Sequence, residues 1–488
     1  MEAGLGLEEA ARRAFDWIGS VAVDVDGGLG WLEGGVLSDD LYSGTAGVLL
    51  GCAEAAAAGL DTAQVAAGAR ARLLHLARHD PGAATMPDDG LFGGWAGVAV
   101  ALHAWSRVAA DAAAASAAGQ VTSQIAGHIV RAPAVRPRYT DVISGDAGIL
   151  LALIADGSDA AMQAAHVLAD RLAEAAELGP GGLHWRMTAE WEFLMPGFSH
   201  GTAGVAYALA AAGRTLNRSD LVDVATRGAC ALLAIGHHPD GWAVPLAIPP
   251  PPRGPEVSFG WCHGAAGTVR LFLLLNEIDP QPRWQRAIGA CLQAVRDSRL
   301  PIRLYPGYWD NLARCCGTAG VGQLLLDRYQ ATGDTTLLDW AGTLAADVAG
   351  RAASTPHGVT WSNTEYTRTP PELPRNRASC RAPPESPAGW PGSTPFTPAP
   401  IPRPSRPGLA RHGFDGIHPG PCRPHTYREL DSANNDRICC NEVRSRSTRH
   451  RGRRSCPCRR KPSLLALAAA SRSVTNTPSN LALGPADL

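Results

Sequence analysis

SGTAGVLL, at Ser43–Leu50, is the first of six related stretches in this 488-residue chain. Each stretch contains Gly-x-Ala-Gly followed by an apolar run, and successive copies begin 50, 51, 56, 63 and 53 residues apart. Most copies are preceded by another helical stretch, such as the one around Ala63–Ala77. A pattern with this period predicts helical hairpins arranged in a ring or a solenoid. The other copies are GGWAGVAVAL from Gly93, SGDAGILLAL from Ser144, HGTAGVAYAL from His200, HGAAGTVRLF from His263 and CGTAGVGQLL from Cys316.

The glycines have two interpretations. They let inner helices pack closely, which is sufficient for the first three copies, or they leave backbone N–H groups at a helix start open to a ligand. The residue before each first glycine is then expected to face a central space. Polar and metal-binding types gather in the last three copies, because these six residues are Ser43, Gly93, Ser144, His200, His263 and Cys316.

Three cysteines occupy matching places in two successive copies, Cys262 in GWCHG and Cys315 with Cys316 in RCCG. If the repeats form a ring, these loops are neighbours and three thiolates converge on one metal. Zinc with three protein ligands keeps a fourth position open, which is the catalytic arrangement. Packing between helices is the alternative, and a vicinal disulfide would need an oxidising compartment and strained geometry. In contrast, Cys52, Cys230 and Cys291 lie within apolar or helical runs and are expected to be core residues.

Two further polar residues stand at repeat loops. His200 lies in PGFSHGTAG, beside the predicted metal site, where it can act as a proton donor or acceptor rather than as a structural histidine. Asp141 stands four residues before Gly145, and a catalytic role and a helix-initiating role are equally compatible with that place.

Composition divides the chain near residue 375. The part before that point has 25 Lys+Arg and 38 Asp+Glu and is rich in Ala, Leu and Gly, whereas residues 375–488 have 19 Lys+Arg and 7 Asp+Glu and are rich in Pro, Arg and Ser. The N-terminus lacks the basic and apolar regions of a signal peptide, and no apolar run is long enough to span a membrane. We therefore expect a cytoplasmic protein with reduced thiols, no integral membrane segment and no nucleic-acid partner.

The motifs SHGTAG, WCHGAAG and CCGTAG resemble those of the lanthionine synthetase C-like family over about residues 1–370. The resemblance implies an all-α fold, an α/α toroid of seven helical hairpins with a catalytic zinc. By motif, Cys262, Cys315 and Cys316 correspond to the zinc ligands, although many members have histidine at the third place. His200 and Asp141 correspond to the acid/base pair, and Trp261 and His263 to substrate-orienting residues. Ser258 stands where some bacterial cyclases have arginine.

The resemblance also implies the reaction. Members add a cysteine thiol to dehydroalanine or dehydrobutyrine in a dehydrated precursor peptide, which forms lanthionine or methyllanthionine rings. This chain shows no dehydratase portion, so a separate dehydratase is expected. The alternatives are addition of glutathione or another small thiol to a dehydroamino acid, an α/α-toroid glycosidase, for which the loops lack paired carboxylates, and a non-catalytic scaffold.

Six repeats are visible where the family has seven, so residues 1–374 are predicted to form the toroid without its last hairpin, and the ring is expected to remain open. One interpretation of residues 375–488 is a disordered basic tail. The other is a change of reading frame near residues 374–379, because Ser379–Gly392 can be back-translated and read one base out of register as MQGAAGIAGWLAR. On the first interpretation, the stretch CCNEVRSRSTRHRGRRSCPCRR would suggest a nucleic-acid or metal-binding arm. We prefer the second, on which the tail cysteines carry no function; they are Cys380, Cys422, Cys439, Cys440, Cys456 and Cys458.

Overall fold

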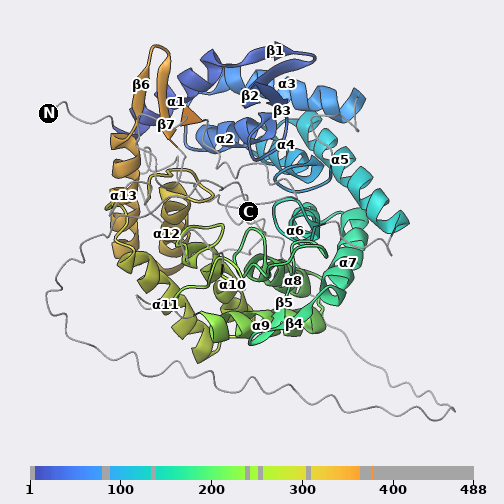
Figure 1. Ribbon diagram of the computed structural model, residues 1–488. Coiled ribbons are helices and arrows are strands. Elements are labelled where there is room, and N and C mark those ends of the chain that lie inside the picture. The colour runs from blue at the N-terminus through green and yellow to red at the C-terminus, as the bar shows by residue number, and fades with distance from the viewer. Residues whose placement is uncertain are drawn as a thin grey trace, which may run out of the picture.

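Two concentric layers of helices form a ring in this protein (Figure 1). The computed structural model describes residues 6–33, 35–79, 88–132, 139–236, 242–250, 257–303, 309–362 and 375–376. Thirteen helices lie within these residues. The inner layer contains α2 (Thr45–Ala57), α4 (Trp95–Ala109), α6 (Asp146–Asp156), α8 (Thr202–Thr215), α10 (Ala265–Ile278) and α12 (Thr318–Thr332). The outer layer contains α1 (Leu7–Ser20), α3 (Ala63–His79), α5 (Ala112–Arg131), α7 (Asp159–Glu174), α9 (Ser219–Ile235), α11 (Pro282–Asp297) and α13 (Thr335–Gly350). The predicted helical toroid is therefore confirmed.

Each Gly-x-Ala-Gly motif begins an inner helix, as the repeat predicts. The first glycine is the N-cap in every copy, with an extended backbone. The second glycine has no room for a side chain: a Cβ added at Gly204 would lie 1.9 Å from the carbonyl oxygen of Phe198, and one added at Gly267 would lie 1.8 Å from that of Trp261. We call the loops that end at the first glycines loops 1 to 6; these glycines are Gly44, Gly94, Gly145, Gly201, Gly264 and Gly317.

Backbone hydrogen bonds join the six loops in series. In four of the five junctions, the donor lies two residues before the first glycine. Each loop donates a hydrogen bond to the next loop along the chain. In the last junction, the N–H of Cys262 in loop 5 donates to the carbonyl of Cys315 in loop 6 at 3.3 Å. The loops therefore form a ladder around the ring that fixes the position of each side chain relative to the next loop. The other junctions are Tyr42 to Phe92 at 3.0 Å, Phe92 to Ile143 at 2.8 Å, Val142 to Ser199 at 3.0 Å and Ser199 to Cys262 at 2.8 Å.

Three outer helices are followed by antiparallel hairpins that the sequence analysis did not predict. In each hairpin a glycine is followed three residues later by a tryptophan, whose indole N–H donates to a carbonyl in the preceding helix 13 residues earlier. Trp31, Trp185 and Trp361 make these bonds at 2.9, 2.7 and 2.7 Å. The strands are β1 (Val23–Val25), β2 (Gly28–Glu33) and β3 (Val36–Ser38) after α1; β4 (Glu177–Gly179) and β5 (Gly182–His184) after α7; and β6 (Ala353–Thr355), β7 (Gly358–Ser362) and β8 (Arg375–Asn376) after α13.

The last hairpin closes the outer layer. Each hairpin packs on the following outer helix: Gly28 lies against α3, Gly182 against α9 and Gly358 against α1. Helix α1 also contacts α13 (Figure 1). The expectation of an open ring is therefore wrong for the outer layer, because α13 supplies the outer helix of a seventh hairpin. The expected start of the seventh inner helix, near residue 380, lies outside the described residues, as do the proposed tail and frame change, apart from β8.

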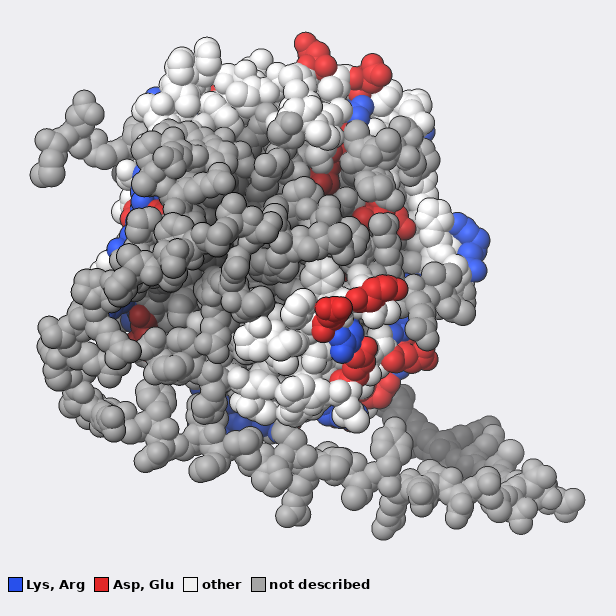
Figure 2. Space-filling model, in the orientation of Figure 1, with Lys and Arg blue, Asp and Glu red and all other residues white. Residues whose placement is uncertain are grey.

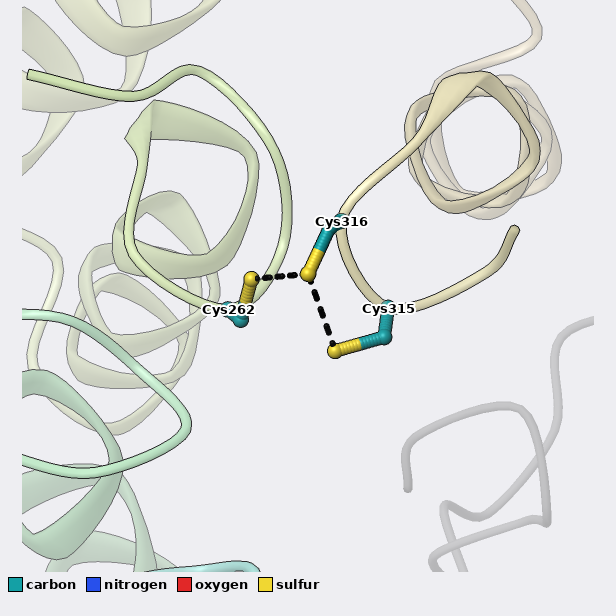
Figure 3. Close-up of side chains that lie close together, drawn as sticks. All are labelled: Cys262, Cys315 and Cys316. Atoms are coloured by element: carbon teal, nitrogen blue, oxygen red, sulfur yellow. Dashed lines mark hydrogen bonds between the residues drawn. The ribbon is translucent and has the colours of Figure 1, made fainter. Parts of the chain in front are cut away.

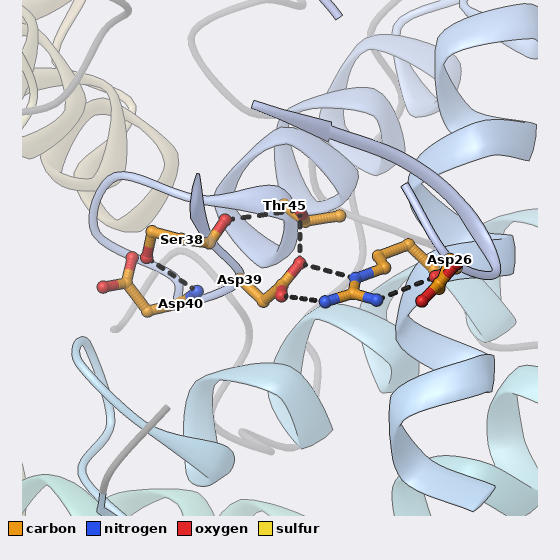
Figure 4. A network of polar contacts seen from close by, with 6 residues as sticks. Asp26, Ser38, Asp39, Asp40 and Thr45 are labelled. Atoms are coloured by element: carbon orange, nitrogen blue, oxygen red, sulfur yellow. Dashed lines mark hydrogen bonds and ion pairs between the residues drawn. The ribbon is translucent and has the colours of Figure 1, made fainter. Parts of the chain in front are cut away.

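Most side chains at the interface of the two layers are apolar and buried, and one continuous core runs around the ring. A buried ion pair is one exception: Arg72 of α3 donates to both carboxylate oxygens of Asp39, at 3.2 and 2.9 Å, and to the carbonyl of Asp26 (Figure 4). On the face seen in Figure 2, acidic and basic side chains of the described residues are interspersed. Within the described part of the chain, no helix has both the length and the apolar character needed to cross a membrane.

Candidate metal and catalytic centre

Three cysteine side chains from neighbouring loops converge at the inner layer (Figure 3). Cys262 belongs to loop 5, before α10, and Cys315 and Cys316 belong to loop 6, before α12. The Sγ of Cys316 lies 2.8 Å from that of Cys262 and 3.5 Å from that of Cys315. All three sulfur atoms lie within 4.8 Å of one another, so the predicted convergence is present.

The two loops approach closely because glycines leave space between them. A Cβ added at Gly260 would lie 2.7 Å from the carbonyl oxygen of Cys316. On the other side of loop 5, the carbonyl of Cys262 accepts hydrogen bonds from the backbone N–H and the hydroxyl of Ser199, at 2.8 and 3.1 Å. Loop 5 is therefore held on both sides, and the Cys262 side chain is 4% exposed.

This donor set fits a metal ion. The Sγ of Cys316 stands 2.8 and 3.5 Å from the other two sulfur atoms, which is longer than the roughly 2.05 Å of a disulfide. Sulfur atoms that share a tetrahedral zinc at about 2.3 Å stand about 3.8 Å apart, so small side-chain rotations suffice to reach that geometry. Among the described residues, these are the only His, Cys, Asp and Glu side chains that form such a group of three or more.

The three cysteines that the sequence assigns to the core lie elsewhere. Cys52 on α2 and Cys291 on α11 are free and fully buried, and burial raises the pKa of the Cys52 thiol to about 12. Both agree with the prediction of small core residues. Cys230 on α9 also belongs to the buried core, with 9% exposed, so the prediction of a core residue is confirmed; this cysteine is in addition disulfide-bonded.

Loops 3 and 4 bring Asp141 and His200 into contact. The Nδ1 atom of His200 lies 2.6 Å from the Oδ2 atom of Asp141. The other oxygen of Asp141 accepts the backbone N–H of Ser144 at 3.1 Å, and its side chain is only 1% exposed. Asp141 therefore organises its own loop and also contacts the histidine, whereas the N-cap of the following helix α6 is Gly145. The contact orients the His200 ring through its Nδ1 atom.

His263 connects this pair to the cysteines. Its ring stacks on that of His200, with ring centres 5.7 Å apart and planes 30° apart, and it directly follows Cys262. Burial, together with the nearby His200, lowers the pKa of His263 to about 3, so the ring is neutral. Its Nδ1 atom is buried and has no hydrogen-bond partner among the described residues.

Trp261 lies on the other side of Cys262, inside an aromatic group. Its ring centre is 5.7 Å from that of Phe92 and 5.3 Å from that of Phe198. Sequence analysis missed both phenylalanines, although Phe198 occupies the same repeat position as Trp261, three residues before the first glycine. Ser258 accepts the backbone N–H of Gly260 at 3.4 Å and so takes part in the local turn.

Comparison with known proteins agrees with this geometry. A profile described as lanthionine synthetase C-like protein matches residues 35–358. The chain belongs to the lanthionine synthetase C-like family. The match ends at Gly358, within β7, and contains all six inner loops and every site residue named above.

Solved structures support the fold of this lanthionine synthetase C-like protein. Nisin cyclase superposes with a TM-score of 0.51 at 14% identity, over 62% of this chain and 80% of that one. A protein from Listeria innocua covers 78% of this chain and 92% of its own at 11% identity, but its TM-score of 0.43 is too low to support an argument. No curated protein matches the chain in a sequence comparison.

Proposed function

We propose that this protein is a zinc-dependent cyclase that adds a cysteine thiol of a peptide to dehydroalanine or dehydrobutyrine and forms a thioether ring. The observation that carries the proposal is the convergence of three cysteine side chains beside the loop that bears a histidine–aspartate pair. Membership of the lanthionine synthetase C-like family and the likeness of the fold to nisin cyclase support it.

Cys262, Cys315 and Cys316 are the residues that would hold the zinc. A zinc ion bound there would lower the pKa of a substrate thiol and keep it as a thiolate in the fourth ligand position. Three protein thiolates give the site a formal charge of −1, compared with 0 for two cysteines and a histidine. This additional negative charge favours a more nucleophilic substrate sulfur.

His200 is the proposed acid. When the substrate thiolate adds to the β-carbon of the dehydroamino acid, one carbon–sulfur bond forms and negative charge develops on the enolate. His200 supplies the proton that the α-carbon needs, through Nε2, because Nδ1 is bound to Asp141. Asp141 holds the ring in this orientation and stabilises its protonated form. The proton balance is complete, since the substrate thiol has released one proton before the addition.

The neighbouring aromatic side chains would orient the substrate. Trp261 is only 7% exposed and directly precedes Cys262. His263 directly follows Cys262 and stacks on His200, and its lowered pKa keeps it uncharged, so it does not compete as a cation for the enolate. We propose that both side chains restrict how the dehydroamino acid approaches the sulfur.

The proposed substrate is a dehydrated precursor peptide in the cytoplasm, made by a separate dehydratase. The alternative function is addition of a small thiol such as glutathione to a dehydroamino acid, which the sequence WCHGAAG around Cys262 favours. The two activities separate in one experiment. A peptide with one cysteine and one dehydroalanine is offered together with glutathione. The glutathione adduct is heavier than the peptide, whereas the ring has the mass of the peptide but no free thiol, so mass spectrometry after alkylation of free thiols distinguishes the two products.

The decisive variant is Cys316→Ala. We expect it to lose most bound zinc, measured by elemental analysis, and most ring formation on the dehydrated peptide. Cys52→Ala is the matched control, because it removes a buried thiol of the same inner layer that contacts no ligand position. If Cys316→Ala retains its zinc and cyclises at the rate of the unmodified protein, the proposed site is wrong.

A further inference from the structure

Loop 6 carries two of the three clustered cysteines and is the last loop of the backbone ladder. Loops 1 to 5 each donate a hydrogen bond to the next loop in the ring. Each of these five loops also places an apolar side chain against the second glycine of the next repeat. These side chains stand three residues before the first glycine of their own loop; they are Leu41, Leu91, Val142, Phe198 and Trp261.

Arg314 occupies that position in loop 6 and breaks the apolar pattern. Its backbone is held like that of the other loops, since its carbonyl oxygen lies 2.0 Å from a Cβ added at Gly320. Its side chain crosses to the start of the ring instead, where the guanidinium lies 2.7 Å from the carboxylate of Glu54 on α2. The two residues are 260 positions apart in sequence.

This ion pair joins the two ends of the described inner layer. Helix α2 follows loop 1 and α12 follows loop 6, so the pair connects the first inner repeat with the sixth (Figure 1). The Glu54 side chain is 15% exposed and that of Arg314 is 39% exposed. Arg314 directly precedes Cys315 and Cys316, so a contact that holds its side chain also limits the movement of both sulfur atoms.

We propose that Glu54 and Arg314 are positioning residues, which lock loop 6 to the first inner helix and thereby hold Cys315 and Cys316 at the distance from Cys262 that a shared metal requires. The inference rests on the proposed metal site. It assigns to α2, which has no side chain in the cysteine cluster, a role in metal affinity.

The first test is Glu54→Gln, with zinc affinity measured by competition with a chromogenic chelator. Loss of one partly exposed ion pair is expected to weaken zinc binding by up to about fivefold. Hydrogen exchange of the zinc-free protein provides a readout that needs no metal, and the amides of residues 311–317 should exchange faster in the variant. The matched control is Glu277→Gln, which breaks the 3.2 Å ion pair of Arg214 on α8 with Glu277 on α10 and should change neither quantity.

Arg314→Glu separates positioning from a simple charge effect. Added negative charge beside the thiolates would by itself strengthen zinc binding, whereas repulsion from Glu54 would displace loop 6 and weaken it. We expect weaker binding, and we expect the double variant Glu54→Arg with Arg314→Glu to recover most of the original affinity. Unchanged exchange in residues 311–317 of Glu54→Gln, or stronger zinc binding by Arg314→Glu, would overturn the proposal. An unmodified protein that binds no zinc would instead refute the proposed function, and the exchange experiment would still test the lock.

Discussion

Asp141→Asn tests how the proposed acid is controlled. In the structure, Asp141 makes two contacts: Oδ2 lies 2.6 Å from Nδ1 of His200, and Oδ1 accepts the N–H of Ser144. Asparagine keeps the size of the side chain and can still accept the backbone bond. It removes the negative charge that stabilises a protonated His200, and it allows the amide to hold the ring in the wrong tautomer.

The expected loss follows from that single contact. A hydrogen bond to a charged group contributes about 1.5 to 3 kcal/mol net, and each 1.36 kcal/mol added to a barrier lowers a rate about tenfold. If the Asp141 carboxylate stabilises His200 fully only while His200 carries a proton, loss of that stabilisation should lower the rate of ring formation about 10- to 150-fold. Zinc content should not change, because Asp141 is not one of the three clustered side chains.

The assay is single-turnover ring formation on a dehydrated peptide by the zinc-loaded protein. Asp40→Asn is a matched control, because Asp40 occupies the same place in loop 1 and accepts the N–H of Ser43 at 2.7 Å. The residue of loop 2 that corresponds to His200 is Gly93, so Asp40 has no histidine to orient. Equal losses of rate in Asp40→Asn and Asp141→Asn would show that only loop structure matters, and the reasoning about His200 would fail.

Three further predictions concern stability, each measured by urea unfolding. Asp39→Asn should cost about 3 to 5 kcal/mol, because it leaves the buried guanidinium of Arg72 without its carboxylate (9% and 0% exposed); a loss below 1 kcal/mol would contradict this. Gly358→Ala should cost about 2 to 4 kcal/mol, since φ is +150° and the new Cβ would lie 2.1 Å from the carbonyl oxygen of Arg13; an unchanged stability would show that the contact between β7 and α1 does not close the outer layer. Hydrogen bonding to Arg70 lowers the pKa of Asp111 to about 2 from an ordinary 3.8. The stability that this charge contributes is therefore complete above about pH 4 and lost as the pH falls towards 2, so Asp111→Asn should differ from the unmodified protein less at pH 2 than at pH 5.

The repeat made much of the site predictable. Because each Gly-x-Ala-Gly begins an inner helix, residues at equal distances from the first glycine occupy equivalent places around the ring. Cys262 and Cys315 share the place two residues before that glycine, and His200, His263 and Cys316 share the place directly before it. Their convergence could therefore be inferred from spacing alone, once the repeats were taken to form a ring.

Contacts between distant repeats were not predictable in this way. The glycine-to-tryptophan spacing of the three hairpins recurs only after the first, fourth and seventh outer helices, so it escapes a search at a period near fifty. The pair of Arg314 with Glu54 joins residues 260 positions apart and breaks the local pattern. The partner of the Arg314 side chain depends on which inner helix lies next to loop 6 in the folded ring.

The sequence by itself determined the helical repeat, the family and the identity of the clustered cysteines, because these depend on local spacing and on side-chain chemistry. Tertiary structure decided three other things: that the outer layer closes through β7 and α1, that Asp141 binds His200, and that loop 6 is tied to α2. Each of these is a contact between segments far apart in the chain, and its geometry is fixed by the packing of the whole ring rather than by any single repeat.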